Sequence, residues 1–213
     1  MNYKKRILLK IGSNTLTKET DNISRGKIED IANQIAMLQD EYEFIIVSSG
    51  AIAVAKQFVK LESKGKEINV KQALASIGQP HLIRIYQEIF REYGLLSSQC
   101  LLSYSDFEKQ ESKTNIVNTI NVLVSNNYIP IINENDTVAT DEIQFGDNDK
   151  LGALTASLLN VDLFIIATNT NGIYTKKSIE HKKPVTIESV EDIKHLQEEI
   201  VSSKSSHGSG GMQ

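Results

Sequence analysis

The sequence predicts an α/β protein, a three-layer α/β/α sandwich built around a mainly parallel central sheet. Four short apolar runs, rich in β-branched residues, end abruptly in polar or glycine-containing loops. Runs without polar alternation are typical of strands that helices cover on both faces. Helical patterns lie between the runs, and strand–helix–strand repetition gives βαβ units with right-handed crossovers.

The individual elements follow from the spacing of their apolar residues. The four predicted strands are 7–9, 44–47, 129–132 and 163–166, and residues 98–102 form a fifth. Between them, apolar side chains recur at the i, i+3, i+4, i+7 spacing of one buried helix face. The predicted helix faces are Ile28, Ile31, Ala32, Ile35 and Leu38, with Ser24 as N-cap; Ile116, Ile120, Leu123 and Val124; and Leu151, Leu154 and Leu158.

Size and charge narrow the class of protein. The 213 residues carry 23 Lys+Arg against 27 Asp+Glu, a net charge of -4, and 6% of them are aromatic. This mildly acidic balance provides no global field to attract a nucleic acid or an anionic membrane. No run approaches the ~20 apolar residues of a membrane span, and residues 7–11 are too short for a signal-peptide core. We therefore expect a single cytoplasmic domain over residues 1–213, without nucleic-acid or membrane partners, in which Cys100 is a buried thiol rather than a nucleophile.

Polar residues collect directly after the predicted strands. The segments 10–14, 48–51, 133–136 and 168–172 each follow one of the four apolar runs. Because the carboxyl ends of parallel strands meet at one edge of a sheet, where α/β folds bind ligands, these loops should form one site.

The loop after the first strand contains a lysine and a glycine. Lys10 is either a cation held at the sheet edge or an ordinary solvated lysine. Gly12 permits a positive φ, a close approach of backbone to an anion, or a simple tight turn. Neither a Walker A sequence nor a GxGxxG pattern is present, so a phosphate site here must be built differently.

The loop after the second strand leads into a predicted helix that starts at Ala51. Unpaired N–H groups at a helix N-terminus attract anions, which makes Ser49 and Gly50 candidates for phosphate contact. Plain N-capping by Ser48 or Ser49 is the alternative interpretation.

The stretch 132–150 concentrates carboxylates and amides before an apolar-faced helix. Asp149 either caps that helix or orients a neighbouring cation. Asp147 or Asp149 would suit Mg²⁺, which prefers one or two carboxylates together with phosphate oxygens and water. The 4 histidines show no metal-ligand spacing and are expected at packing or surface positions.

Taken in order, these loops resemble the motifs of the amino acid kinase family, and most closely its branch that phosphorylates the γ-carboxylate of glutamate. The asparagine- and aspartate-rich pair of motifs is the specific part, whereas the lysine–glycine loop alone is a weak signal. The resemblance runs from about Lys5 to the last residue. Its motifs are 10–13, 47–53, 132–140 and 145–149.

The resemblance implies an eight-stranded, mainly parallel sheet and an ATP- and Mg²⁺-dependent conversion of L-glutamate to L-glutamyl 5-phosphate, the first step of proline biosynthesis. It also implies a cytoplasmic homo-oligomer that is inhibited by proline and supplies glutamate-5-phosphate reductase. The implied catalytic residues are Lys10, which contacts the transferred phosphoryl group, and Asp149, which orients the side chain of Lys10. The implied glutamate contacts are Ser49, Asn133, Asp136 and Asn148, and the implied nucleotide contacts are Lys10, Gly12, Ser13, Gly50, Thr168, Asn169, Ser209, Gly210, Gly211 and Met212.

Two positions depart from the family pattern. Asn169 stands where the family usually has aspartate. Residues 208–213 resemble the start of the family's glycine-rich nucleotide loop, which usually continues into a threonine and a second catalytic lysine. The sequence thus predicts that the C-terminal part of the domain is missing, together with the RNA-binding-like (PUA) domain of many members.

The expected chemistry is in-line phosphoryl transfer without a general base, because an ionised carboxylate is already a nucleophile. Lys10 and Mg²⁺ are expected to offset the repulsion between the carboxylate and the triphosphate. The alternatives are a kinase of the same fold that acts on acetylglutamate, aspartate or carbamate, and a catalytically silent amino-acid-binding module.

Overall fold

The computed structural model describes residues 4–17, 23–62, 67–138, 148–170, 172–174 and 186–191. Within these ranges, five strands form one sheet in the order β3-β4-β2-β1-β5, and every pairing is parallel. All five predicted strands are present, and the parallel pairing confirms the predicted fold class. The strands are β1 Lys5–Ile11, β2 Tyr42–Ser48, β3 Leu96–Leu102, β4 Tyr128–Glu134 and β5 Leu163–Ala167.

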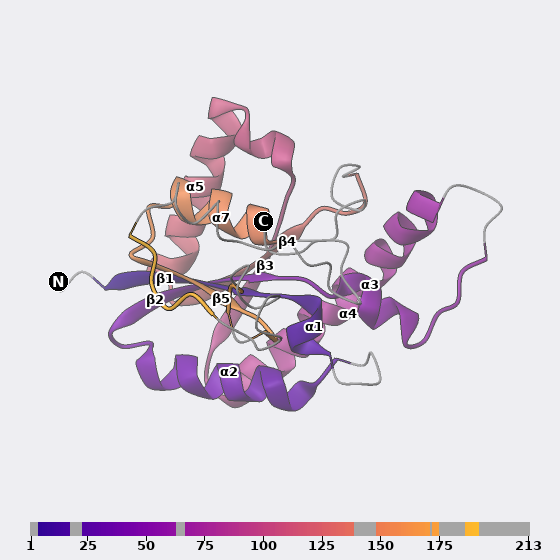
Figure 1. Cartoon of the computed structure of the whole chain (residues 1–213), viewed down its shortest axis with the longest axis horizontal. Coiled ribbons are helices and arrows are strands. Elements are labelled where there is room, and N and C mark those ends of the chain that lie inside the picture. The colour runs from indigo at the N-terminus through magenta and orange to yellow at the C-terminus, as the bar shows by residue number, and fades with distance from the viewer. Residues whose placement is uncertain are drawn as a thin grey trace.

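Helices cover both faces of this sheet. Figure 1 shows α2 on one side of the sheet and α5 with α7 on the other, which gives the three layers. No helix in the described ranges is long and apolar enough to cross a lipid bilayer. The helices are α1 Ser13–Leu16, α2 Arg25–Leu38, α3 Ala51–Lys56, α4 Glu67–Glu92, the 3-10 helix η1 Tyr104–Phe107, α5 Gln110–Ser125 and α7 Asp149–Leu158.

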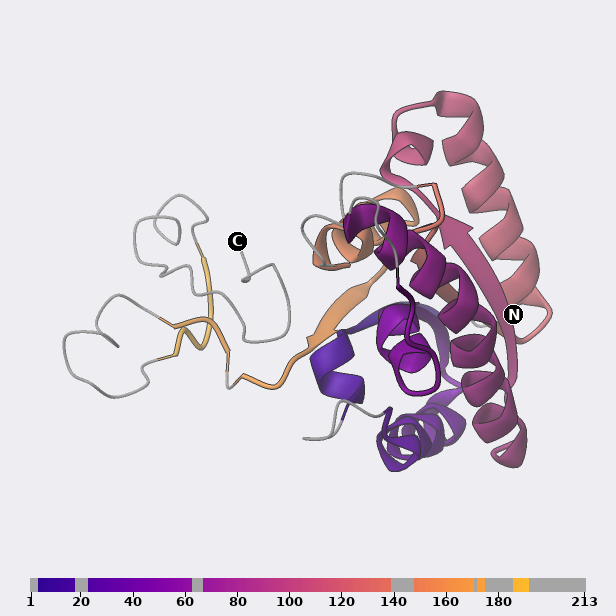
Figure 2. The same cartoon turned by 90° about the vertical axis from the view of Figure 1, so that its right-hand side faces the viewer.

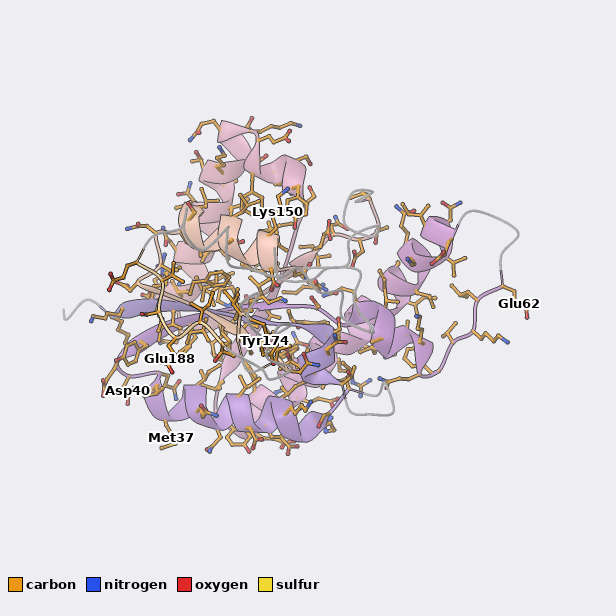
Figure 3. All side chains as sticks on the ribbon, in the orientation of Figure 1. Met37, Asp40, Glu62, Lys150, Tyr174 and Glu188 are labelled. Atoms are coloured by element: carbon orange, nitrogen blue, oxygen red, sulfur yellow. The ribbon has the colours of Figure 1, made fainter. Side chains whose placement is uncertain are left out.

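The two faces of the sheet form two separate apolar cores. Alternate strand residues, such as Ile46 and Ile131, pack under α2 and α4. The residues between them, such as Leu8 and Ile132, pack under α5 and α7. Side chains alternate between the two faces of a strand. The polar residues at the strand ends therefore also point alternately to the α2–α4 side and to the α5–α7 side of the sheet. In Figure 3, Met37 on α2 and Lys150 on α7 accordingly lie on opposite sides of the sheet.

The longest helix is α4, which the sequence patterns above did not predict. Its 26 residues span about 39 Å at 1.5 Å per residue, whereas the 7-residue strands span about 23 Å. The C-terminal half packs in the first core through Leu82, Tyr86 and Phe90. The N-terminal half continues past the carboxyl ends of the strands, as Figures 1 and 2 show. One helix thus contacts both the core and the edge where ligands bind in α/β folds.

Close packing holds α4 in this position. A Cβ added to Gly78 would lie 1.8 Å from the carbonyl oxygen of Ala51, so only glycine lets α4 cross α3 at this distance. Pro80 also lies inside α4, where it removes one helical hydrogen bond. Tertiary packing therefore overrides two residues that usually interrupt helices.

Several predicted details differ from the structure. Leu38 is 42% exposed rather than buried. Ser24 occupies the N-cap position of α2, but its side chain makes no capping hydrogen bond. Leu123, Leu154 and Leu158 are half-buried at the margin of the second core.

The predicted burial of Cys100 is only partly correct. The thiol is half-buried on the edge strand β3. Burial raises its pKa, and a raised pKa leaves little of the reactive thiolate at neutral pH.

Candidate active site

Lys10 and Asp149 form an ion pair at the carboxyl edge of the sheet. Lys10 follows Leu8 by two residues on β1, so it points to the face covered by α7, and Asp149 is the first residue of that helix. The two side chains are only 8% and 24% exposed. The interpretation of Lys10 as an ordinary solvated lysine is therefore wrong. The N-cap of α7 is Asn148 and Asp149 is the first helical residue, so Asp149 does not occupy the capping position that one interpretation gave it.

Glycines allow a close approach on both sides of this pair. A Cβ added to Gly152 of α7 would lie 3.0 Å from the ring of Phe164 and 3.5 Å from Cβ of Lys10. A Cβ added to Gly12 would lie 3.3 Å from Nζ of Lys10. The φ of Gly12 is -75°, so the positive-φ interpretation is wrong. Bare backbone next to the ammonium group leaves room for an anion there.

A chain of amide side chains occupies the neighbouring strand ends. Nδ2 of Asn148 donates to the carbonyl of Ser48 and to Oδ1 of Asn133, both at 2.7 Å. Nδ2 of Asn133 in turn donates to Oε1 of Gln79 at 2.7 Å, while its Oδ1 also accepts from the backbone N–H of Glu134 at 2.9 Å. Asn133 and Asn148 are both buried. The chain crosses the top of the sheet and joins the α7 layer to α4.

The end of β2 is tied to β1 and to α4. The N–H of Ser49 donates to the carbonyl of Ile11 at 3.1 Å, and Gly50 has a φ of 109° at the N-cap of α3. The Oγ of Ser48 contacts the carbonyl of Ser49 and, at 3.0 Å, the hydroxyl of Tyr86. No side chain caps α3, so N-capping by Ser48 or Ser49 is wrong. Burial raises the pKa of Tyr86 and keeps this hydroxyl neutral.

Asp136 lies in the turn that follows β4. The N–H of Asn135 donates to the carbonyl of Leu102 at 2.8 Å, and the N–H of Val138 donates to the carbonyl of Asn135 at 3.0 Å. Asp136 is half-buried between these bonds. Desolvation raises the pKa of its carboxyl from 3.8 to about 6. The raised pKa indicates that burial has removed water from this carboxylate. A cationic ligand bound beside it would replace the lost hydration.

The nucleotide candidates after β5 lie on the other side of β1. Thr168 and Asn169 are exposed at the strand end, and Oγ1 of Thr168 contacts Oγ1 of Thr170 at 3.1 Å. Thr15, which the sequence did not single out, donates its hydroxyl to the carbonyl of Ala167 at 3.0 Å. This bond fixes α1, which begins at Ser13, beside the end of β5.

The sheet order makes these positions neighbours. The strands β4, β2, β1 and β5 are adjacent, so the four loops that the sequence singled out emerge side by side. Gln79 and Tyr86 are the functional candidates that sequence reasoning missed, because both lie on α4, far from any motif in the chain. The candidates Asp147, Ser209, Gly210, Gly211 and Met212 lie outside the described residues.

The available oxygen donors are compatible with Mg²⁺. In the described ranges, no three His, Cys, Asp or Glu side chains gather into a metal site of their own. Mg²⁺ bound with a nucleotide needs only one or two carboxylates, since phosphate oxygens and water complete its shell. Asp149 offers such a carboxylate. His81 packs on Phe58 with ring centroids 4.6 Å apart, while the other histidines are outside the described part.

Comparison with known proteins defines the class. A sequence profile described as the amino acid kinase family matches residues 5–213. The chain belongs to this family. A solved structure titled "X-ray structures of isopentenyl phosphate kinase" has the same fold, with a TM-score of 0.62 and 16% identity over 90% of this chain and 83% of that one.

Three similar relatives are named glutamate 5-kinase. Glutamate 5-kinase of Alkaliphilus metalliredigens (strain QYMF) is 40% identical over 100% of this chain and 81% of its own length. Glutamate 5-kinase of Oceanobacillus iheyensis is 42% identical over 99% of this chain, and that of Clostridium acetobutylicum is 38% identical over 97% of this chain. The chain spans 78% of the Clostridium relative and 57% of the Oceanobacillus relative.

Proposed function

We propose that this chain transfers the γ-phosphoryl group of ATP to the γ-carboxylate of L-glutamate and forms L-glutamyl 5-phosphate. The observation that carries the proposal is the Lys10–Asp149 ion pair next to the amide chain of Asn148 and Asn133. This arrangement sets one buried cation beside neutral acceptors at a single sheet edge. The names of the most similar relatives support glutamate as the acceptor.

The reaction requires little covalent assistance from the protein. A γ-carboxylate oxygen attacks the γ-phosphorus, the bond to the ADP oxygen breaks, and ADP leaves with the bonding electron pair. No proton has to move, so the barrier is mainly electrostatic. Lys10 is placed to offset the charge of the transferred group, and Asp149 holds its ammonium in one position. A preorganised charged donor of this kind costs no reorganisation during the reaction.

The amino-acid end of the substrate is assigned to the loops after β2 and β4. Asp136 is an anion at neutral pH, because its pKa is about 6, and it is half-desolvated. We assign it to the α-ammonium group of glutamate, which replaces its lost hydration. Ser49, Asn133 and Asn148 line the neighbouring strand ends and complete this part of the site.

The nucleotide is assigned to the β1 and β5 side. Gly12, Ser13, Thr168 and Asn169 on this side, together with Gly50 after β2, are assigned to phosphate and nucleoside contacts, which the bare backbone at Gly12 favours.

Asp149 is assigned as a Mg²⁺ ligand, directly or through water. When bound, the ion neutralises triphosphate charge and supplements Lys10.

The biological setting follows from the family resemblance. We propose a cytoplasmic homo-oligomer in proline biosynthesis that is inhibited by proline, with glutamate-5-phosphate reductase consuming its labile product.

Hydroxylamine trapping tests the proposed reaction, because an acyl phosphate converts to a coloured hydroxamate. With Mg-ATP, the purified protein should form hydroxamate from L-glutamate and at most traces from aspartate, N-acetylglutamate or carbamate. Selective product from one of those acceptors would identify another kinase of the fold. Glutamate binding without ATP turnover would identify a silent binding module and contradict the proposal.

A further inference from the structure

The amide chain has a fixed donor and acceptor order that no sequence motif reveals. A side-chain amide has two N–H hydrogens and one carbonyl oxygen. Both hydrogens of Asn148 are committed, one to the carbonyl of Ser48 and one to Oδ1 of Asn133. Within the described residues no hydrogen bond uses the carbonyl oxygen Oδ1 of Asn148, so this is the atom of the side chain that we expect to receive a ligand. An oxygen in this position can accept from an ammonium group but cannot donate to a carboxylate.

Two acceptors set the orientation of the Asn148 amide, the backbone carbonyl of Ser48 and Oδ1 of Asn133. Oδ1 of Asn133 accepts from Asn148 and from the N–H of Glu134. If the two ends of the Asn133 amide were exchanged, Nδ2 would replace Oδ1 opposite these two N–H groups. The two buried N–H groups would then face another donor and would lose their acceptor. The bond from Nδ2 of Asn133 to Oε1 of Gln79 favours the observed orientation, because this nitrogen then meets an acceptor.

Gln79 is well placed to hold the far end of this chain. It lies on α4 between Gly78, which packs against Ala51, and Leu82 in the first core. The helix is therefore anchored on both sides of Gln79. The residue is half-buried, and it stands at the point where α4 passes the end of β4.

We propose that Gln79 is a positioning residue of the amino-acid subsite. Through Asn133 it holds Asn148 so that Oδ1 of Asn148 and the carboxylate of Asp136 form an acceptor set for the α-ammonium group of the substrate. Gln79 itself touches no reacting atom. This inference rests on the proposed function, since it assumes that the ligand is an α-amino acid.

The test compares two ligands that differ in the ammonium group alone. L-glutamate and glutarate share a five-carbon chain with two carboxylates, and glutarate lacks the α-ammonium. Calorimetric titration with each ligand measures binding independently of turnover. Gln79→Met removes the acceptor at similar size, Gln79→Ser is polar but too short to reach Asn133, and Gln79→Glu retains an acceptor oxygen. Gln87→Met is the matched control, at an exposed position of the same helix.

We expect Gln79→Met and Gln79→Ser to weaken L-glutamate binding about 10-fold, the usual effect of leaving one buried polar group without its partner. Glutarate binding should stay within about 2-fold, and turnover at saturating glutamate should change by no more than about 2-fold. Gln79→Glu should restore glutamate binding to within about 3-fold of the wild type, and Gln87→Met should have no effect.

Two results would overturn the role of Gln79 alone: unchanged glutamate affinity in Gln79→Met and Gln79→Ser, or an equal loss of glutamate and glutarate binding. The second result would indicate a general distortion of the site. A wild-type protein that binds no L-glutamate would overturn the proposed function as well, so the wild-type titration separates the two failures.

Discussion

The two halves of the candidate site are built from different chemistry. On the β1–α7 side, a lysine and a carboxylate form a charged pair with bare glycine backbone beside it. On the β2–β4–α4 side, neutral amides form a directed chain that ends at Gln79. Under the proposed function, the charged pair lies where the two anions approach each other, and the amides lie where the amino acid is recognised by its donors and acceptors. The difference suggests that transition-state stabilisation and substrate affinity can be separated by mutation.

The largest effect should come from removing the cation. Lys10→Ala should lower turnover ~100- to 1000-fold, the usual cost of losing one preorganised donor. The Michaelis constant for glutamate should change by no more than about 3-fold, because the amide half remains. Steady-state hydroxamate assays measure both quantities. Lys5→Ala, at the exposed beginning of the same strand, is the control, and unchanged turnover in Lys10→Ala would refute the assignment.

Asp149 should affect turnover by holding the ammonium group of Lys10 in position. Asp149→Asn keeps the shape but removes the charge that holds the ammonium, so we expect turnover to fall about 10- to 100-fold. If the pair acts as a unit, the double variant with Lys10→Ala should lie within about 3-fold of Lys10→Ala alone. Multiplied losses in the double variant, measured by the same assay, would show that Asp149 does not act through Lys10 alone, and would leave its assignment as a Mg²⁺ ligand as the role that is separate from Lys10.

The amide half should respond to pH through Asp136. Its pKa of about 6 means that the carboxyl becomes neutral as the pH falls below 6 and loses its attraction for the α-ammonium group. The Michaelis constant for glutamate should therefore rise about 10-fold per pH unit below this value in the wild type. Asp136→Asn should show a high, pH-independent Michaelis constant between pH 5 and pH 8. The same pH dependence in both proteins would contradict the ammonium contact.

The smallest effect is expected on stability. The folded pKa of Asp136 lies above its value of 3.8 in the unfolded chain, so the folded state binds more protons between these values and stability decreases as the pH rises through this window. Asp136→Asn removes the cost of keeping a desolvated carboxylate charged. Without ligand and above pH 6, this variant should be more stable than the wild type by on the order of 1 kcal/mol, a figure reduced to allow for the partial exposure of the side chain. Urea unfolding at pH 8 and pH 3.5 tests this, because the difference should disappear at the lower value. A variant less stable than the wild type at pH 8 would contradict the desolvation argument.

Sequence reasoning placed the charged half better than the amide half. Lys10 could be placed at the carboxyl edge of the sheet because it ends an apolar strand. Since the carboxyl ends of parallel strands lie at the same edge, the sequence also predicted that the polar loops lie close together. From the residues alone, Asp149 suited a helix cap, a metal or a cation, and the family resemblance was what pointed to Asp149 as the residue that orients Lys10. The choice depends on how closely α7 approaches β1, which Gly152 permits.

The amide half depends on α4, a helix that the spacing of apolar residues in the sequence did not predict. Gly78 and Pro80 are unfavourable inside a helix, and the helix persists through them because residues on both sides of them, such as Leu74 and Leu82, are buried. Gln79 and Tyr86 act on strand ends that are distant in sequence, so their partners are defined by tertiary packing alone. A lone glutamine with no motif around it carries no signal that spacing could detect.

The separation of the two halves is tested most directly by titrating L-glutamate into the Lys10→Ala and Asp149→Asn double variant. We predict a dissociation constant within about 3-fold of the wild type, although this protein should form almost no hydroxamate. A loss of glutamate affinity of more than about 10-fold would contradict the separation, because the charged pair would then be part of the amino-acid subsite itself.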